Sequence, residues 1–208
     1  SMRDPWGYMG GWMSWFGGHK FDPASRRRLD SEERRAYLDP DAILEAFQVG
    51  TGTRMADVGT GVGFFTLPAA KRVGPKGRVF AIDLSSEMLE DLHAKLETEE
   101  VANVETYLST EDRIPLADAS VDFAFLACVL HELAGAGTLL ECRRILRPKG
   151  RLGVVDWKKI DQEEGPPKEH RLDEAEVAAF LREAGFAPTR TFEAGPYHYG
   201  IEARLAPR

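Results

Sequence analysis

The sequence predicts an α/β protein built on a mostly parallel β-sheet, and three observations carry that prediction. Short apolar runs such as residues 79–82 alternate with helical segments along most of the chain. Strands that are apolar throughout are typical of parallel sheets with helices on both faces, a three-layer, doubly wound arrangement. The last two expected strands, residues 188–192 and 199–205, have no helix between them. We therefore expect them to pair antiparallel at one edge of the sheet.

Length and composition indicate one globular domain with a short extension. The chain has 208 residues, 43% of them hydrophobic, and 27 basic against 34 acidic side chains give a net charge of −7. This balance excludes general disorder and disfavours a nucleic-acid binder. No apolar run reaches the roughly 18 residues of a membrane-spanning helix. The two cysteines, Cys128 and Cys142, are too few for a disulfide framework, so we expect a reducing compartment, the cytoplasm.

Local signals place the elements. Asp39 before Pro40 is typical of a helix start, and Asp173 followed by Glu176 is typical of a capping box. Pro68 falls inside an expected helix, where it should cost a hydrogen bond or a kink. The expected helices are residues 39–47, 63–73, 86–97, 138–146 (ended by Pro148 and Gly150) and 173–184. The remaining expected strands are residues 54–58, 104–108, 121–126 and 152–155.

Residues 1–18 differ from the rest of the chain. They contain three of the four tryptophans, Trp6, Trp12 and Trp15, among five glycines. A dense aromatic cluster of this kind indicates a segment that covers a surface. It could pack on a second copy of the chain as a dimer contact, close over an active site as a lid, or lie on a membrane surface. We divide the chain into this arm and a single domain, residues 19–208.

The main chemical motif is a glycine turn after the first strand. Asp57 ends that strand, and Gly59, Gly61 and Gly63 lead into the next helix. Glycines let a ligand approach the backbone closely, and a helix start offers free N–H groups to a negatively charged ligand group. The dinucleotide fingerprint requires a glycine or alanine where this chain has Phe64, which disfavours a nicotinamide-dependent oxidoreductase. A tight turn without a ligand is the structural alternative.

A second acid follows the second strand. Asp83 lies about 20 residues after Gly63, where a carboxylate accepts hydrogen bonds from a ribose diol. The alternative is a helix-start acid stabilised by the helix dipole. After the third strand, the polar segment 109–118 either reads an adenine edge or forms a solvated loop.

These motifs together resemble class I S-adenosylmethionine (SAM)-dependent methyltransferases, of the methyltransferase type 11 or ubiquinone/menaquinone-biosynthesis-like group. The resemblance rests on the glycine turn, Asp83, the segment 114–123 and the segment 141–150, in the family's order. It implies SAM as cofactor and a seven-stranded Rossmann-like sheet of order 3-2-1-4-5-7-6. The implied activity is methyl transfer to a small-molecule acceptor. An inactive SAM-binding regulator or assembly factor is the alternative.

The resemblance also assigns cofactor contacts. Residues 59–63 would contact the methionine part of SAM and Asp83 the ribose, while Leu84 and Met88 would pack by the adenine. Adenine recognition falls to Glu111 or Asp112. The full predicted set is Asp57, Gly59, Thr60, Gly61, Gly63, Asp83, Leu84, Met88, Glu111, Asp112 and Cys128.

The candidate catalytic residues follow the fourth and fifth strands. His131 is a candidate general base, because its ordinary pKa suits neutral pH, or a helix-start histidine without a proton role. Asp156 either serves the reaction, or instead acts as a cap or pairs with Lys158. His19 and Phe21 would reach the site if the arm closes.

Several other side chains have simpler interpretations. Cys128 could bind a soft substrate such as arsenic but is better interpreted as a small apolar group. Arg34 and Arg35 are expected on a solvated helical face. His198, like His93 and His170, is expected on a surface or a strand. Carboxylates are not grouped for Mg²⁺, so we predict no metal site.

Overall fold

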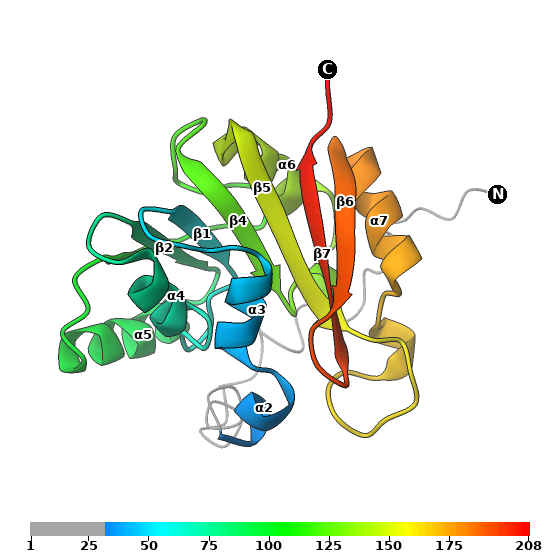
Figure 1. Ribbon diagram of the computed structural model, residues 1–208, viewed down its shortest axis with the longest axis horizontal. Helices are drawn as coiled ribbons and strands as arrows, with labels where there is room; N and C mark the ends of the chain where they lie inside the picture. Colours follow the sequence, from blue (N-terminus) through cyan, green and yellow to red (C-terminus); the bar gives the residue numbers. More distant parts are fainter. Residues whose placement is uncertain (1–31) are drawn as a thin grey trace.

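The computed structural model describes residues 32–208, which form one seven-stranded sheet in the order β3-β2-β1-β4-β5-β7-β6 (Figure 1). Strands β1 to β5 are parallel to one another, whereas β7 is antiparallel to both β5 and β6. The predicted sheet order and the closing antiparallel pair are confirmed. The strands are β1 (Arg54–Val58), β2 (Arg78–Asp83), β3 (Val104–Leu108), β4 (Val121–Ala127), β5 (Leu146–Trp157), β6 (Phe186–Glu193) and β7 (His198–Leu205).

Helices cover both faces of this sheet. Phe123 and Phe125 of β4 pack with side chains of α3 and α4, whereas Ala124 and Leu126 pack with side chains of α6 and α7. This alternation follows from the two-residue period of a strand. The helices are α2 (Glu32–Tyr37), α3 (Pro40–Ala46), α4 (Thr66–Val73), α5 (Ser86–Thr98), α6 (Gly137–Ile145) and α7 (Glu174–Glu183), with the 3-10 turns η2 (Leu130–Glu132) and η3 (Lys168–His170).

Side-chain caps explain where three helices begin. The Asp39 carboxylate accepts a hydrogen bond from the Ala42 N–H, and the Asp173 carboxylate accepts one from the Glu176 N–H. The Ser85 hydroxyl accepts from the N–H of the third residue of α5. Each cap satisfies an N–H group that has no partner inside its helix.

The cost predicted for Pro68 is wrong. Helix α4 begins at Thr66 rather than at residue 63, so Pro68 is its third residue. The first four N–H groups of a helix have no intrahelical partner, and proline therefore loses nothing there.

Strand β5 also differs from its predicted bounds. It begins directly after α6 at Leu146, and Pro148 and Gly150 lie within it. The pairing register with β4 shifts between Val121 and Phe123, which marks a bulge. A bulge accepts a proline because the extra residues make no ladder hydrogen bonds.

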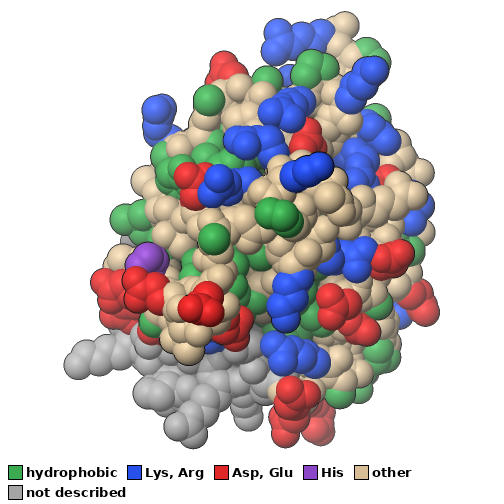
Figure 2. All heavy atoms as spheres, turned by 60° about the vertical axis from the view of Figure 1, so that its left-hand side comes forward, with side chains coloured by type: hydrophobic (Ala, Val, Ile, Leu, Met, Phe, Trp, Pro, Cys, Tyr) green, Lys and Arg blue, Asp and Glu red, His purple; other side chains and the backbone are tan. Residues whose placement is uncertain are grey.

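The side of the sheet where the parallel strands begin and the side where they end differ in charge. Basic residues stand at the beginnings of β1, β2 and β5 and near the end of β7: Arg54, Arg78, Arg147, Lys149 and Arg204. Figure 2 shows many Lys and Arg side chains in the upper part of the molecule. The opposite edge, where β1, β2, β4 and β5 end, brings together the acids that follow these strands. Open α/β sheets bind ligands at such a carboxyl edge. No helix among residues 32–208 is long and apolar enough to cross a membrane.

Candidate functional site

A buried carboxylate, Asp57, holds the glycine turn through hydrogen bonds. Asp57 is 2% exposed, and its Oδ2 accepts hydrogen bonds from the hydroxyls of Thr66 (2.6 Å) and Thr60 (3.2 Å). Burial raises the pKa of Asp57 to about 6, although the two hydroxyls oppose the shift. Asp57 and Thr60 therefore fix the turn against the start of α4.

The three glycines of the turn have positive φ angles of +80°, +55° and +87° and different surroundings. A Cβ on Gly63 would lie 2.6 Å from Leu92 Cδ1, and one on Gly59 would lie 2.5 Å from Val129 Cγ2. A Cβ on Gly61 would meet nothing within 4 Å. Gly59 and Gly63 thus permit close packing within the protein, and Gly61 borders space that no residue of 32–208 fills within 4 Å.

Asp83 connects this turn to the start of α5. Its Oδ2 accepts from the Gly61 N–H (2.8 Å) and its Oδ1 accepts from the Ser85 N–H (2.9 Å). Burial raises the pKa of Asp83 while the backbone donors lower it. Each carboxylate oxygen has two acceptor sites, so one remains on each oxygen for a diol. The next residue, Leu84, is 38% exposed and offers an apolar surface beside it, whereas Met88 is 1% exposed and lies in the core. This arrangement fits the ribose and base of a nucleoside.

The two acids predicted for adenine recognition lie in different surroundings. Glu111 Oε1 accepts from the Ala134 N–H (2.7 Å), which ties the loop after β3 to the loop before α6. Asp112 is exposed, and its Oδ1 lies 1.9 Å from the place of a Cβ on Gly137. Gly137 is therefore required for the close approach of these two loops.

The structure brings His131 and Asp156 together. His131 Nδ1 lies 2.7 Å from Asp156 Oδ1, and the His131 backbone N–H donates to Asp156 Oδ2 (3.1 Å). The side chains are 6% and 1% exposed. Of the alternatives for Asp156, pairing with Lys158 is wrong, because the Lys158 ammonium bonds Glu193 instead (2.8 Å).

The sequence suggested that the pKa of His131 lies near neutral pH, but in the structure this pKa is higher. Burial lowers its pKa, but the charge and hydrogen bond of Asp156 and the charge of Glu132 outweigh burial and raise the pKa to about 9. Glu132 Oε1 lies 3.6 Å from His131 Nε2, and burial raises the pKa of Glu132 to about 8. The His131 imidazole therefore lies between the carboxyl groups of Asp156 and Glu132, and it stays protonated at neutral pH.

Sequence reasoning missed two residues at this edge. Arg34 of α2 was expected on a solvated face, but its guanidinium carbon lies 4.2 Å from the centroid of the Phe64 ring, at the glycine turn. His198, the first residue of β7, is fully buried. It lies opposite Trp157 in the β5–β7 pairing, a register that no local motif encodes.

Both cysteine thiols have a raised pKa, which disfavours the reactive thiolate. Cys128 follows β4 with a φ of +59°, and burial raises its thiol pKa to about 12. Cys142 is fully buried in α6, and both are free. Within residues 32–208, no group of three or more His, Cys, Asp or Glu side chains is placed to hold a metal ion. His19, Phe21 and the arm lie outside the described residues.

The sheet order and the carboxyl-edge site define a Rossmann-like methyltransferase fold. A family model described as "Methyltransferase domain" matches residues 56–154. The crystal structure of a SAM dependent methyltransferase from Aquifex aeolicus is 39% identical and superposes with a TM-score of 0.85, covering 90% of this chain and 100% of that one. The chain therefore belongs to the class I SAM-dependent methyltransferases, and the predicted family and cofactor are confirmed.

The curated relatives are longer than this chain. An uncharacterized 37.1 kDa protein in transposon TN4556 of Streptomyces fradiae is 40% identical over 130 residues, 61% of this chain and 36% of its own length. An arsenite methyltransferase of Halobacterium salinarum is 32% identical over 106 residues, 50% of this chain and 27% of its own length. The chain thus spans well under two thirds of these relatives.

Proposed function

We propose that the chain transfers the methyl group of SAM to a small-molecule acceptor at the carboxyl edge of β4 and β5. The observation that carries this proposal is the open space at Gly61, bounded by the Asp83 carboxylate and the exposed Leu84 side chain. SAM supplies a methyl group that is already activated by a sulfonium leaving group.

On the cofactor side, the described residues bind and orient. Asp83 accepts the ribose hydroxyls with its two remaining acceptor sites, and Leu84 packs against the adenine. Gly61 allows the methionine part to pass over the turn, which Asp57 and Thr60 hold in shape. Glu111, Asp112, Met88 and Cys128 complete the proposed surroundings of the cofactor.

On the acceptor side, His131 and Asp156 position the wall formed by the segments after β4 and β5. In an in-line displacement the protein mainly aligns the reacting atoms, an effect worth up to roughly 7–11 kcal/mol in ideal cases. An acceptor that must lose a proton needs a base. The raised pKa keeps His131 protonated at neutral pH, so we assign it a positioning role there.

The remaining expectations are part of the proposal. The free cysteines support a reducing compartment, the cytoplasm. We expect no nucleic-acid partner because the candidate site is lined by acids, including Asp83, Glu132 and Asp156. We propose that the arm, residues 1–18, acts as a lid or joins two copies of the chain.

Incubation with methyl-labelled SAM and a panel of phenols, amines, thiols and arsenite tests the function. We expect S-adenosylhomocysteine (SAH) and one labelled product in equal amounts. An unreactive panel, with SAH bound tightly, would favour the binding protein without catalysis.

A further inference from the structure

His198 is a buried polar side chain that the fold does not use. It is fully buried, and within residues 32–208 neither ring nitrogen has a hydrogen-bond partner. Burial lowers its pKa to about 3, against the charge of Asp156, so the ring is uncharged. Buried polar groups almost always have partners, and an exception needs a reason. A neutral imidazole presents one donor and one acceptor.

Aromatic rings from two other elements lie against this imidazole. The Trp157 ring centroid is 4.0 Å away, and the Tyr37 ring lies parallel to the imidazole within 1° at 6.0 Å. Trp157 is fixed from another side, because a Cβ on Gly165 would lie 2.8 Å from the indole. Tyr37 belongs to α2, which has no buried residue. The Tyr37 ring also packs against Tyr197 (5.5 Å) and forms the outer wall of the His198 surroundings.

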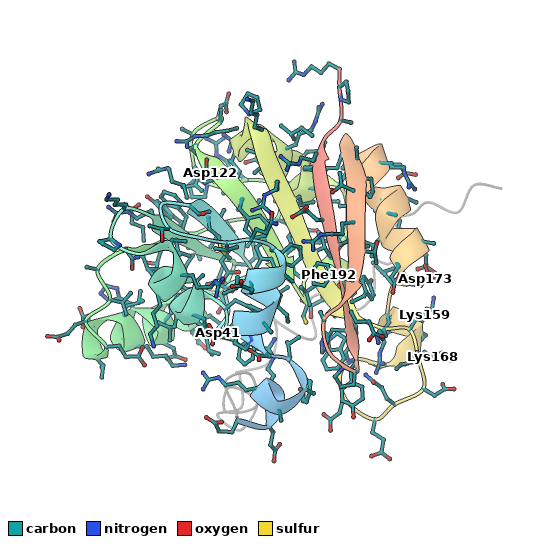
Figure 3. The ribbon with its side chains drawn as sticks, in the orientation of Figure 1. Asp41, Asp122, Lys159, Lys168, Asp173 and Phe192 are labelled. Atoms are coloured by element: carbon teal, nitrogen blue, oxygen red, sulfur yellow. The ribbon has the colours of Figure 1, made fainter. Side chains whose placement is uncertain are left out.

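A groove of about 230 Å³ reaches the same tyrosine from outside. It runs between α2–α3 and the end of β6, where Figure 3 labels Asp41 on α3 and Phe192 on β6. Its wall consists of Tyr37 and mostly small or apolar side chains, among them Ala36, Ala42, Ile43, Ala46 and Phe192. Rotation of the Tyr37 ring would connect this groove with His198.

The imidazole also lies beside the proposed reaction edge. Trp157, its partner across the strands, directly follows Asp156, whose carboxylate holds His131. The side chains of Asp156 and Trp157 project to opposite faces of β5, but the charges of Asp156 and His131 both act on the His198 ring.

We propose that His198 is the polar anchor of the acceptor site and hydrogen-bonds the hydroxyl group of a small, uncharged aromatic acceptor held against Trp157 and Tyr37. A hydroxyl can donate to the acceptor nitrogen of the ring or accept from its N–H, so one hydroxyl satisfies one of the two nitrogens. Aromatic walls select a flat ring. This proposal rests on the proposed function, because the molecule bound at His198 is an acceptor only if the chain transfers methyl groups.

Phenol, with benzene as the analogue that lacks the hydroxyl, tests the anchor in the full chain saturated with SAH. Histidine-labelled protein shows ring signals by NMR, and His198→Phe identifies the signal of His198. We expect phenol to shift that signal and to bind His198→Phe at least about tenfold more weakly than wild type. Benzene should bind both proteins equally or should prefer the variant.

His93→Phe is the matched control, because His93 lies exposed on α5 and pairs with Glu97. It should bind phenol like wild type, and His198→Gln should recover part of the affinity. Phenol that binds wild type and His198→Phe equally, or that leaves the His198 signal unmoved, would overturn the anchor.

The two proposals fail differently. His198→Phe should bind SAH with wild-type affinity and should unfold at an equal or higher temperature, since it removes an unpartnered polar group. If wild type methylates an acceptor of the panel but phenol does not reach His198, the anchor is wrong and the function stands. If SAH does not bind but phenol shifts His198, the proposed function is wrong and the binding site stands.

Discussion

The cofactor half and the acceptor half of the carboxyl edge are built in different ways. In the cofactor half, Asp57 and Asp83 each accept two hydrogen bonds from groups of the same β1–α4–β2–α5 segment. In the acceptor half, His131 comes from the turn η2 after β4 and Asp156 from β5, and His198 has no hydrogen-bond partner among the described residues. The first half is self-contained, whereas the second leaves polar groups to be satisfied by a ligand.

This difference indicates where specificity lies. A self-contained turn suits one cofactor whatever the acceptor is, and function on a shared fold depends on the residues of the variable site. Buried groups that lack partners reject molecules that cannot satisfy them, which makes the acceptor half the selective one.

The largest change in stability is expected from breaking the His131–Asp156 pair. Asp156→Ala leaves a buried imidazolium without its partner and should lower the free energy of unfolding by about 3–5 kcal/mol at pH 6. The folded state raises the pKa of His131 from 6.5 to about 9. The stability from this proton is complete below pH 6.5 and is lost as the pH rises towards 9, so the difference should narrow over that range.

Urea unfolding of both proteins at several pH values measures this difference. Asp161→Ala, which removes an exposed acid paired with Lys168, is the matched control and should cost under about 1 kcal/mol. A constant difference from pH 6 to 9 would show that His131 does not carry the proton.

The stability of the cofactor half should depend on pH over a lower pH range than that of the His131–Asp156 pair. Burial raises the pKa of Asp57 from 3.8 to about 6, so the folded state binds this proton more tightly than the unfolded state. Wild type should therefore lose up to about 3 kcal/mol through this group as the pH rises from about 4 to 6. Asp57→Asn should not show this loss, whereas Asp41→Asn should follow wild type. Identical profiles for wild type and Asp57→Asn would remove Asp57 as a buried acid.

Cofactor binding should depend on the second acid of this half. Asp83→Ala removes the proposed ribose contacts and should weaken SAH binding by about 1–3 kcal/mol in calorimetry. Glu105→Ala, an exposed acid on β3, should bind SAH like wild type. Unchanged affinity in Asp83→Ala would contradict the ribose assignment.

The smallest expected effect is the difference between alanine substitutions at two glycines of the same turn, Gly61 and Gly63. Gly61→Ala should cost about 1–2 kcal/mol of stability through its left-handed φ, and its methyl group enters the space proposed for SAH. Gly63→Ala should cost more stability, because its methyl group would also clash with Leu92. Thermal unfolding and SAH titration should rank the variants in opposite order, with Gly61→Ala the weaker binder. The same order in both measurements would mean that Gly61 borders no ligand.

The sequence predicts the cofactor half well because its signals are local. The acid, the glycine turn and Asp83 lie within one strand–helix–strand unit, and β1 and β3 match their predicted bounds. The acceptor half depends on tertiary contacts. The burial of His198 follows from the β5–β7 register, and the position of Arg34 follows from the way α2 lies against Phe64. The pKa of His131 depends on Asp156, 25 residues away in sequence. Propensity and spacing carry none of this information.

Calorimetric titration of the full chain with SAH and, in parallel, with NAD tests the central claim most directly. The family assignment and the geometry at Gly61, Asp83 and Leu84 predict that SAH binds at one site per chain, and Phe64 in the place of a glycine predicts that NAD releases no measurable heat. Tight binding of NAD without binding of SAH would contradict the assignment of this edge to SAM.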